Sequence, residues 1–293
     1  MSHLFTGAAA AVTTPFKNNL VDYDQFRKHL TFLKDNAIQG FVVNGTTGEG
    51  ATLSDEEKAE LLNVSVNVAD GDIPVIAGTG TNNTAQSIAL SKEAEALGVD
   101  GLLVITPYYN KTSQKGLVAH FTAIADAVQT PIILYDVPAR TGMSMAPETV
   151  EVLAKHPNIV GLKDATGDLA HFSYLQTNIN EDFSYYSGND DLALPYYAQG
   201  GHGIISVLAN ALPKEYQEMY EKAQSNSQEA LKIHQRLYPL VEALNIDVNP
   251  IPIKALTSHL GFGEYELRLP LVPLEENEVS ILTDLFDHIR KDG

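Results

Sequence analysis

The stretch IVGLKDAT (residues 159–166) combines the apolar run of a buried strand with a lysine in its interior. Apolar residues occupy both faces of the run, as they do in parallel strands that helices cover on both sides. The same apolar or β-branched character is found in seven further short runs: AAAAVT (8–13), GFVVNG (40–45), PVIAGTG (74–80), GLLVIT (101–106), PIILYDVP (131–138), SYYSG (184–188) and GIISV (203–207). The sequence therefore predicts eight strands.

Segments of helical character separate these runs, and several begin at Asp, Ser or Thr and end near Gly or Asn. The clearest are residues 22–36, 54–69, 84–98 and 146–157. Eight repeats of strand, loop and helix predict an α/β protein whose parallel sheet closes as a (β/α)8 TIM barrel. An open doubly wound sheet is the alternative. It would place a glycine-rich phosphate turn after the first strand, where AVTTPF (11–16) has no glycine.

The pattern changes near residue 225, after which only helical segments follow, at 227–245, 250–261 and 275–290. We therefore predict a catalytic barrel over residues 1–225 and a C-terminal helical region over residues 226–293. No Gly/Ser-rich linker or charge run separates the two parts, which favours a helical appendage packed on the barrel.

Composition and charge exclude several classes of function. A formal net charge of −18 predicts repulsion from nucleic acid and from anionic membranes. The chain has no cysteine, and its nine histidines form neither an H-x-x-x-H nor an H-E-x-x-H pair, so no metal cofactor is expected. The apolar runs are too short to span a bilayer, and the N-terminus lacks a signal-peptide pattern. These two features predict a cytoplasmic protein.

Lys163 lies inside the predicted strand 159–166, and reacting groups of a TIM barrel come from the C-terminal ends of its strands. Lysine is rarely buried without a partner or a purpose. A structural ion pair with Asp164 is the plainer explanation, but neighbours in a strand point to opposite faces. Burial can instead lower the pKa of a lysine amine from about 10.4 towards about 7 or 8, as a Schiff-base nucleophile requires.

Four other polar side chains are predicted at the same edge of the sheet. Tyr135 ends the run IILY and is either an aromatic core residue or a proton carrier beside the amine. Arg140 lies in the following loop and is either a surface charge or a forked donor to a substrate carboxylate. Thr46 and Thr47 lie in NGTTGEG (44–50), which forms either a turn before the next helix or a cradle for a carboxylate.

Several stretches match a known family. They are GTTGE (45–49), AGTGTN (77–82), TPYYNK (106–111), YDVPARTG (135–142), GLKDATGD (161–168), SGNDD (187–191), NPIPIK (249–254) and ELRLPL (266–271). By these stretches, which span the chain, it resembles the dihydrodipicolinate synthase family, within the wider group that contains N-acetylneuraminate lyase. The resemblance implies a lyase that condenses pyruvate with L-aspartate-4-semialdehyde to 4-hydroxy-tetrahydrodipicolinate, the first committed step of lysine and diaminopimelate biosynthesis.

The resemblance also implies roles for the residues that carry the chemistry. Lys163 would form a covalent Schiff base with pyruvate, with no other cofactor, and Tyr135 would transfer protons. Thr46 would link Tyr135 to Tyr109, and Tyr109 would reach in from a neighbouring subunit of a homodimer or homotetramer.

Substrate binding is implied in the same way. Thr47 would hold the pyruvate carboxylate, and Arg140 would receive the carboxylate of L-aspartate-4-semialdehyde. Gly188 and Ile205 would contribute a main-chain contact and a wall of the pyruvate pocket.

The chain departs from the pattern of lysine-inhibited members of the family around an effector pocket at the subunit interface. Those members carry Ser, two His and Glu where this chain has Gly50, Asp55, Lys58 and Gln86. The missing carboxylate at position 86 removes a partner for the ammonium group of an effector, and Lys58 adds a like charge. The resemblance therefore implies weak or absent feedback by L-lysine.

Two alternatives remain at this point. A sister aldolase that cleaves N-acetylneuraminate or a 2-keto-3-deoxy sugar acid would share Lys163, Tyr135 and GTTGE (45–49). The tyrosine pair in TPYYNK (106–111) and the arginine of VPARTG (137–142) favour the synthase instead. A barrel that has lost catalysis and serves as a binding or assembly protein would be expected to have lost its nucleophile, whereas this chain keeps one.

Overall fold

The computed structural model describes residues 3–291. Eight parallel strands form a closed barrel: β1 (Gly7–Ala11), β4 (Phe41–Val43), β5 (Val75–Gly78), β6 (Gly101–Ile105), β7 (Ile132–Asp136), β8 (Ile159–Asp164), β9 (Ser184–Ser187) and β10 (Gly203–Ser206). The ring closes because β1 pairs with both β10 and β4. All eight predicted strands are confirmed, and the open doubly wound sheet is excluded.

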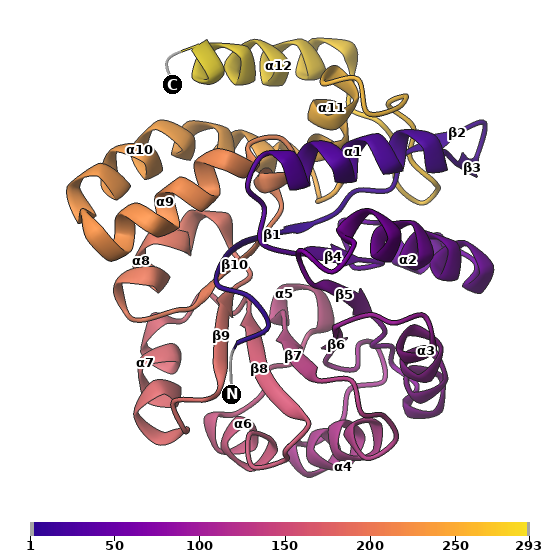
Figure 1. Cartoon of the computed structure of the whole chain (residues 1–293), viewed down its shortest axis with the longest axis vertical. Coiled ribbons are helices and arrows are strands. Elements are labelled where there is room, and N and C mark those ends of the chain that lie inside the picture. The colour runs from indigo at the N-terminus through magenta and orange to yellow at the C-terminus, as the bar shows by residue number, and fades with distance from the viewer. Residues whose placement is uncertain (1–2, 292–293) are drawn as a thin grey trace.

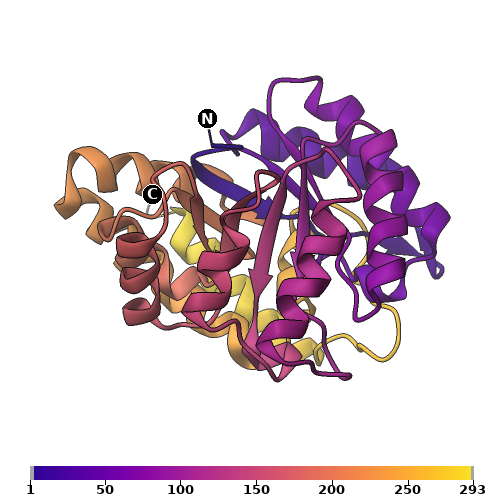
Figure 2. The ribbon, with the colours of Figure 1, turned by 90° about the horizontal axis from the view of Figure 1, so that it is seen from below.

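Helices surround the barrel (Figure 1). Those between the strands are α1 (Tyr23–Asp35), α2 (Asp55–Ala69), α3 (Thr84–Ala96), α4 (Gln114–Ala125), α5 (Pro138–Thr141), α6 (Pro147–Leu153), α7 (Leu169–Asn178) and α8 (Ala193–Ala198). The start of α2 has a capping box: Ser54 accepts a hydrogen bond from the Glu57 backbone, and the Glu57 side chain accepts one from the Ser54 backbone. In a view from below, Figure 2 shows the helices between the barrel strands lying outside those strands.

Four helices follow the last strand: α9 (Pro213–Ser225), α10 (Ser227–Ala243), α11 (Ile251–His259) and α12 (Glu276–Lys291). They pack on the barrel and on one another, with α9 against β1 and α10 against α9 (Figure 1). The predicted C-terminal helical appendage is therefore confirmed. The side chain of Asn226, between α9 and α10, caps the start of α10. The domain boundary at residues 225 and 226 stays a prediction. Within residues 3–291 no helix is long and apolar enough to cross a membrane.

The sequence reasoning missed a small hairpin between β1 and α1. Its strands are β2 (Phe16–Lys17) and β3 (Leu20–Val21), joined by Asn18 and Asn19. Both asparagines adopt left-handed backbone angles, with φ of 53° and 62°. Two consecutive left-handed residues form the tight turn that matches the twist of a hairpin, and asparagine tolerates that conformation well.

Side chains alternate between the inside and the outside of the barrel, apart from a register shift near the start of β8. In β7, Ile133 and Tyr135 point into the barrel, whereas Ile132 and Leu134 pack against the helices. The end of the barrel at the N-termini of the strands is blocked by Phe5, which stacks on the Tyr186 ring at 4.2 Å and accepts a hydrogen bond from its hydroxyl. Only the opposite end holds the cavity described below.

A buried ion pair joins the C-terminal helices to the loop after β4. Lys254 Nζ lies 2.5 Å from Glu49 Oε1, and the two side chains are 2% and 1% exposed. Glu49 also accepts a hydrogen bond from the backbone N–H of Arg268, and the cations of Lys254 and Arg268 both lie over the Phe16 ring. Burial lowers the pKa of Lys254, and the Glu49 charge opposes that shift. A charge buried this deeply is stable only while its partner remains.

We expect Lys254→Met to lower the free energy of unfolding by about 3–5 kcal/mol, because it leaves the Glu49 carboxylate buried without a counter-charge. Urea unfolding followed by circular dichroism measures the loss. Lys232→Met is the matched control, since Lys232 pairs with Glu229 on the surface and should contribute less than about 1 kcal/mol. Equal losses in the two variants would contradict the structural role of the buried pair.

Candidate active site

A cavity of about 660 Å³ lies where the C-terminal ends of the strands meet the following loops. Six of the eight predicted site residues line it: Thr46, Thr47, Tyr135, Arg140, Lys163 and Gly188. They come from the loop after β4, from β7 and α5, from β8 and from the end of β9. The barrel thus gathers in one place residues that are up to 142 positions apart in the chain.

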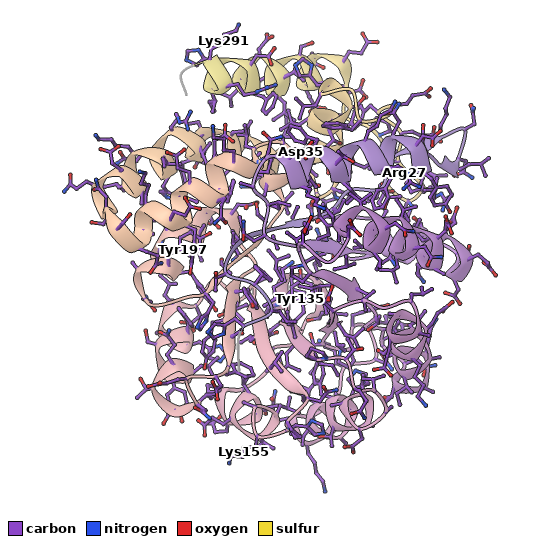
Figure 3. All side chains as sticks on the ribbon, in the orientation of Figure 1. Arg27, Asp35, Tyr135, Lys155, Tyr197 and Lys291 are labelled. Carbon is purple, nitrogen blue, oxygen red and sulfur yellow. The ribbon has the colours of Figure 1, made fainter. Side chains whose placement is uncertain are left out.

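Lys163 and Tyr135 are neighbours inside the barrel. They are paired residues of the adjacent strands β8 and β7, and both strands direct them inward. Lys163 Nζ lies 4.3 Å from the centroid of the Tyr135 ring. The two residues are 6% and 8% exposed. Figure 3 places Tyr135 near the middle of the ring of helices, whereas Lys155 lies at its outer edge.

Asp164 lies on the other face of the same strand, as the alternation predicts. Its carboxylate accepts hydrogen bonds from the backbone and the hydroxyl of Thr166, at 2.8 and 2.7 Å. Asp136, its paired neighbour in β7, accepts from Ser144 and from a backbone N–H. Burial raises the pKa of both carboxyl groups, to about 6 for Asp136. A structural ion pair between Lys163 and Asp164 is therefore excluded.

The loop after β4 holds Thr46 and Thr47 in a tightly folded turn. Asn44 and Glu49 both have left-handed backbone angles, with φ of 62° and 55°. A Cβ atom at Gly50 would lie 2.2 Å from the Asn44 carbonyl oxygen, so only glycine fits this close approach. Glu49, anchored by Lys254, fixes the C-terminal half of the turn. The predicted turn is therefore confirmed, whereas carboxylate binding by Thr46 and Thr47 stays a prediction.

Arg140 lies on the single-turn helix α5, so the prediction of a loop at this position is wrong. Pro138 at the start of the turn and Gly142 in a left-handed conformation at its end account for this short helix. The guanidinium reaches the C-terminal region, where Arg140 Nη2 donates to the carbonyl oxygen of Asn249 at 2.9 Å. Asn249 Nδ2 in turn donates to Thr47 Oγ1 at 3.1 Å.

Two predicted site residues do not line the cavity. Tyr109 is 93% exposed and has a left-handed backbone angle with φ of 66°. Ile205 is fully buried inside the barrel, among the inward-facing side chains. Gly188 does line the cavity, and a Cβ atom there would lie 2.7 Å from the Ala165 Cβ, which explains the glycine.

A second cavity of about 410 Å³ adjoins the first. Residues from both the predicted effector pocket and the active site line it, and Thr46, Tyr135 and Arg140 are common to the two cavities. The second cavity also contains Gly50, Lys58, Gln86 and Tyr108. The Lys58 ammonium group forms an ion pair with Asp55 at 3.2 Å.

Sequence reasoning missed Asn249 and the pair of Glu49 with Lys254. The signal that singled out Lys163, a lysine in an apolar run, also applies to Lys254 in PIPIK (250–254). No comparable signal marks Asn249, because asparagine is common in turns.

The arrangement suits imine chemistry on a small keto acid. A buried amine, a phenol beside it and a hydroxyl on a backbone turn can bind a carbonyl carbon and a carboxylate together. In the part of the chain that the structure describes, no group of three or more His, Asp or Glu side chains could hold a metal ion.

Comparisons with known proteins agree with this chemistry. The profile of the Dihydrodipicolinate synthetase family matches residues 4–289. The chain is 53% identical over 287 residues to the 4-hydroxy-tetrahydrodipicolinate synthase of Macrococcus caseolyticus, covering 98% of this chain and 97% of that one. It is 51% identical to the same enzyme of Staphylococcus haemolyticus, covering 99% of each chain. The crystal structure of dihydrodipicolinate synthase from Thermotoga maritima superposes with a TM-score of 0.96 at 38% identity, covering 98% of this chain and 99% of that one. This chain therefore belongs to the dihydrodipicolinate synthetase family.

Proposed function

We propose that this protein condenses pyruvate with L-aspartate-4-semialdehyde through a Schiff base on Lys163, releasing 4-hydroxy-tetrahydrodipicolinate and water. One observation carries the proposal: a buried lysine amine lies beside a tyrosine ring, 4.3 Å from its centroid, in the cavity at the C-terminal end of the barrel. Membership of the family and the names of its relatives favour this reaction over cleavage of sugar acids.

The first half of the reaction uses the buried amine. Lys163 Nζ attacks the ketone carbon of pyruvate, and loss of water leaves a protonated imine. Removal of a proton from the methyl group then gives an enamine. Tyr135 is the proton carrier, because its side chain shares the inward face of the barrel with the amine.

The second half forms the ring. The enamine carbon attacks the aldehyde carbon of the semialdehyde, whose oxygen takes up a proton. The amine of the substrate then attacks the imine carbon and expels Lys163 Nζ, which frees the enzyme. Thr47 holds the pyruvate carboxylate at the base of the cavity, and Arg140 binds the second carboxylate near its mouth.

Assembly and location complete the proposal. Thr46 relays protons from Tyr135 to Tyr109 of a second subunit, which makes a homodimer the smallest complete enzyme. The exposure of Tyr109 outside both cavities of its own chain supports a role in a partner's site. We place the enzyme in the cytoplasm.

Incubation with pyruvate and borohydride should add one reduced pyruvyl group to the protein, located on Lys163 by peptide mapping. Intact-mass spectrometry measures the adduct. Lys163→Ala should form none, and Lys155→Ala, which removes a lysine at the outer edge of the molecule, should react as the parent does. A folded parent protein without an adduct would refute the proposed function.

Tyr109→Phe should lower kcat by roughly 10- to 1,000-fold, because the proton relay is broken while the pyruvate pocket is intact. Mixed dimers of Tyr109→Phe and Lys163→Ala should regain about a quarter of parental activity per subunit, since half of randomly formed dimers contain one complete site. Re-association from mild denaturant followed by a steady-state assay measures the recovery. Mixtures with no recovery would show that Tyr109 acts within its own chain or not at all.

L-Lysine at millimolar concentration should leave the steady-state rate unchanged, because Lys58 repels an ammonium group and Gln86 offers it no carboxylate. A matched variant, Gln86→Glu with Lys58→His, should become more sensitive to L-lysine. A micromolar inhibition constant for the parent protein would contradict the prediction.

A further inference from the structure

Asn249 contacts both of the residues proposed to bind substrate carboxylates. It lies just before α11, in the C-terminal region, and lines both cavities. Its side chain donates to Thr47, and its backbone carbonyl accepts from Arg140. We infer that Asn249 is a positioning residue that aims the Thr47 hydroxyl at the carboxylate of the keto acid and fixes the Arg140 guanidinium for the second substrate. The inference rests on the proposed function.

The direction of the hydrogen bond to Thr47 determines what the hydroxyl can do. An amide nitrogen donates hydrogen bonds and does not accept them, so Thr47 Oγ1 must be the acceptor in the 3.1 Å contact with Asn249 Nδ2. The hydroxyl hydrogen of Thr47 is therefore left free to point elsewhere. Because Thr47 is only 3% exposed and lines the cavity, a bound carboxylate is the natural acceptor for that hydrogen.

The contact with Arg140 is made by a different part of the same residue. The Asn249 carbonyl oxygen uses one of the five N–H groups of the guanidinium, at Nη2. The other four N–H groups remain available to donate to a carboxylate in the cavity. Because this contact is made by the main chain, side-chain variants at position 249 retain it.

Asn249 is itself held in place. The backbone of Lys254 donates to the carbonyl of Pro250 in the first turn of α11, and the Lys254 ammonium group is fixed by Glu49 in the loop that carries Thr47. The two ends of the Asn249–Thr47 contact therefore belong to segments that the buried ion pair ties together. Because both the Asn249 amide and the Thr47 hydroxyl are fixed in position, their hydrogen bond can orient the hydroxyl.

The test measures the effect of each variant on the binding of pyruvate and of the semialdehyde separately. Asn249→Ala should raise the half-saturating concentration of pyruvate for borohydride trapping by about 5-fold, the effect of one lost hydrogen bond. Asn249→Asp, which has nearly the same shape, should raise the half-saturating concentration of pyruvate by more than about 10-fold. Its carboxylate accepts the hydroxyl hydrogen of Thr47 and repels the carboxylate of pyruvate. The KM for the semialdehyde should change less than about 2-fold in Asn249→Ala. Asn277→Ala, on the exposed start of α12, is the control and should match the parent.

A double-mutant cycle shows whether Asn249 acts through Thr47. Thr47→Val removes the hydroxyl at almost constant volume, and adding Asn249→Ala to it should raise the half-saturating pyruvate concentration by less than about 2-fold. Fully additive effects would overturn the inference, as would an Asn249→Asp variant that binds pyruvate like the parent. Thermal unfolding of each variant distinguishes a specific effect on pyruvate binding from a general loss of structure. A parent protein that traps no pyruvate refutes the proposed function, whereas a parent that traps it beside unaffected Asn249 variants refutes only the positioning role.

Discussion

Closure of the eight-stranded sheet is the constraint on which the rest of the structure depends. Because β1 hydrogen-bonds to β10 on one side and to β4 on the other, the barrel has no free strand edge, and its inward side chains are surrounded by other strands. Lys163, one residue before the end of β8, is therefore paired with Tyr135 of β7 on one side and with Tyr186 of β9 on the other. Closure thus buries the amine and places it over the ring of Tyr135.

The helical region after the barrel lines the cavity that holds Lys163. Three of its residues contact the loop after β4: Asn249, Lys254 and Arg268. The last two hold Glu49 and with it the turn that presents Thr46 and Thr47, while the first contacts Thr47 and Arg140 directly. The packing of the appendage and the conformation of the loop that carries Thr46 and Thr47 are therefore linked through one buried ion pair.

The barrel and most of the residues that line its cavity could be predicted from the sequence, because both depend on local patterns. Strand alternation placed Lys163 inside and Asp164 outside, and both placements are confirmed. The hairpin at residues 16–21 was missed although its paired asparagines are a local signal. The pair of Glu49 with Lys254 could not be predicted, because it joins residues 205 positions apart and only the fold brings them together. The proposed role of Tyr109 would depend on a second subunit, which no pattern within one chain describes.

Phe5 and Tyr186 fill the barrel where the N-terminal ends of the strands meet, and the opposite end opens into the cavity. Lys163 lies deep in it, whereas Arg140 is exposed beside the entrance. If the semialdehyde binds at Arg140 as proposed, pyruvate passes that place on its way to the amine, and the water lost on imine formation leaves along the same path. On that assignment a bound aldehyde would narrow the path of the keto acid, which favours binding of the keto acid first.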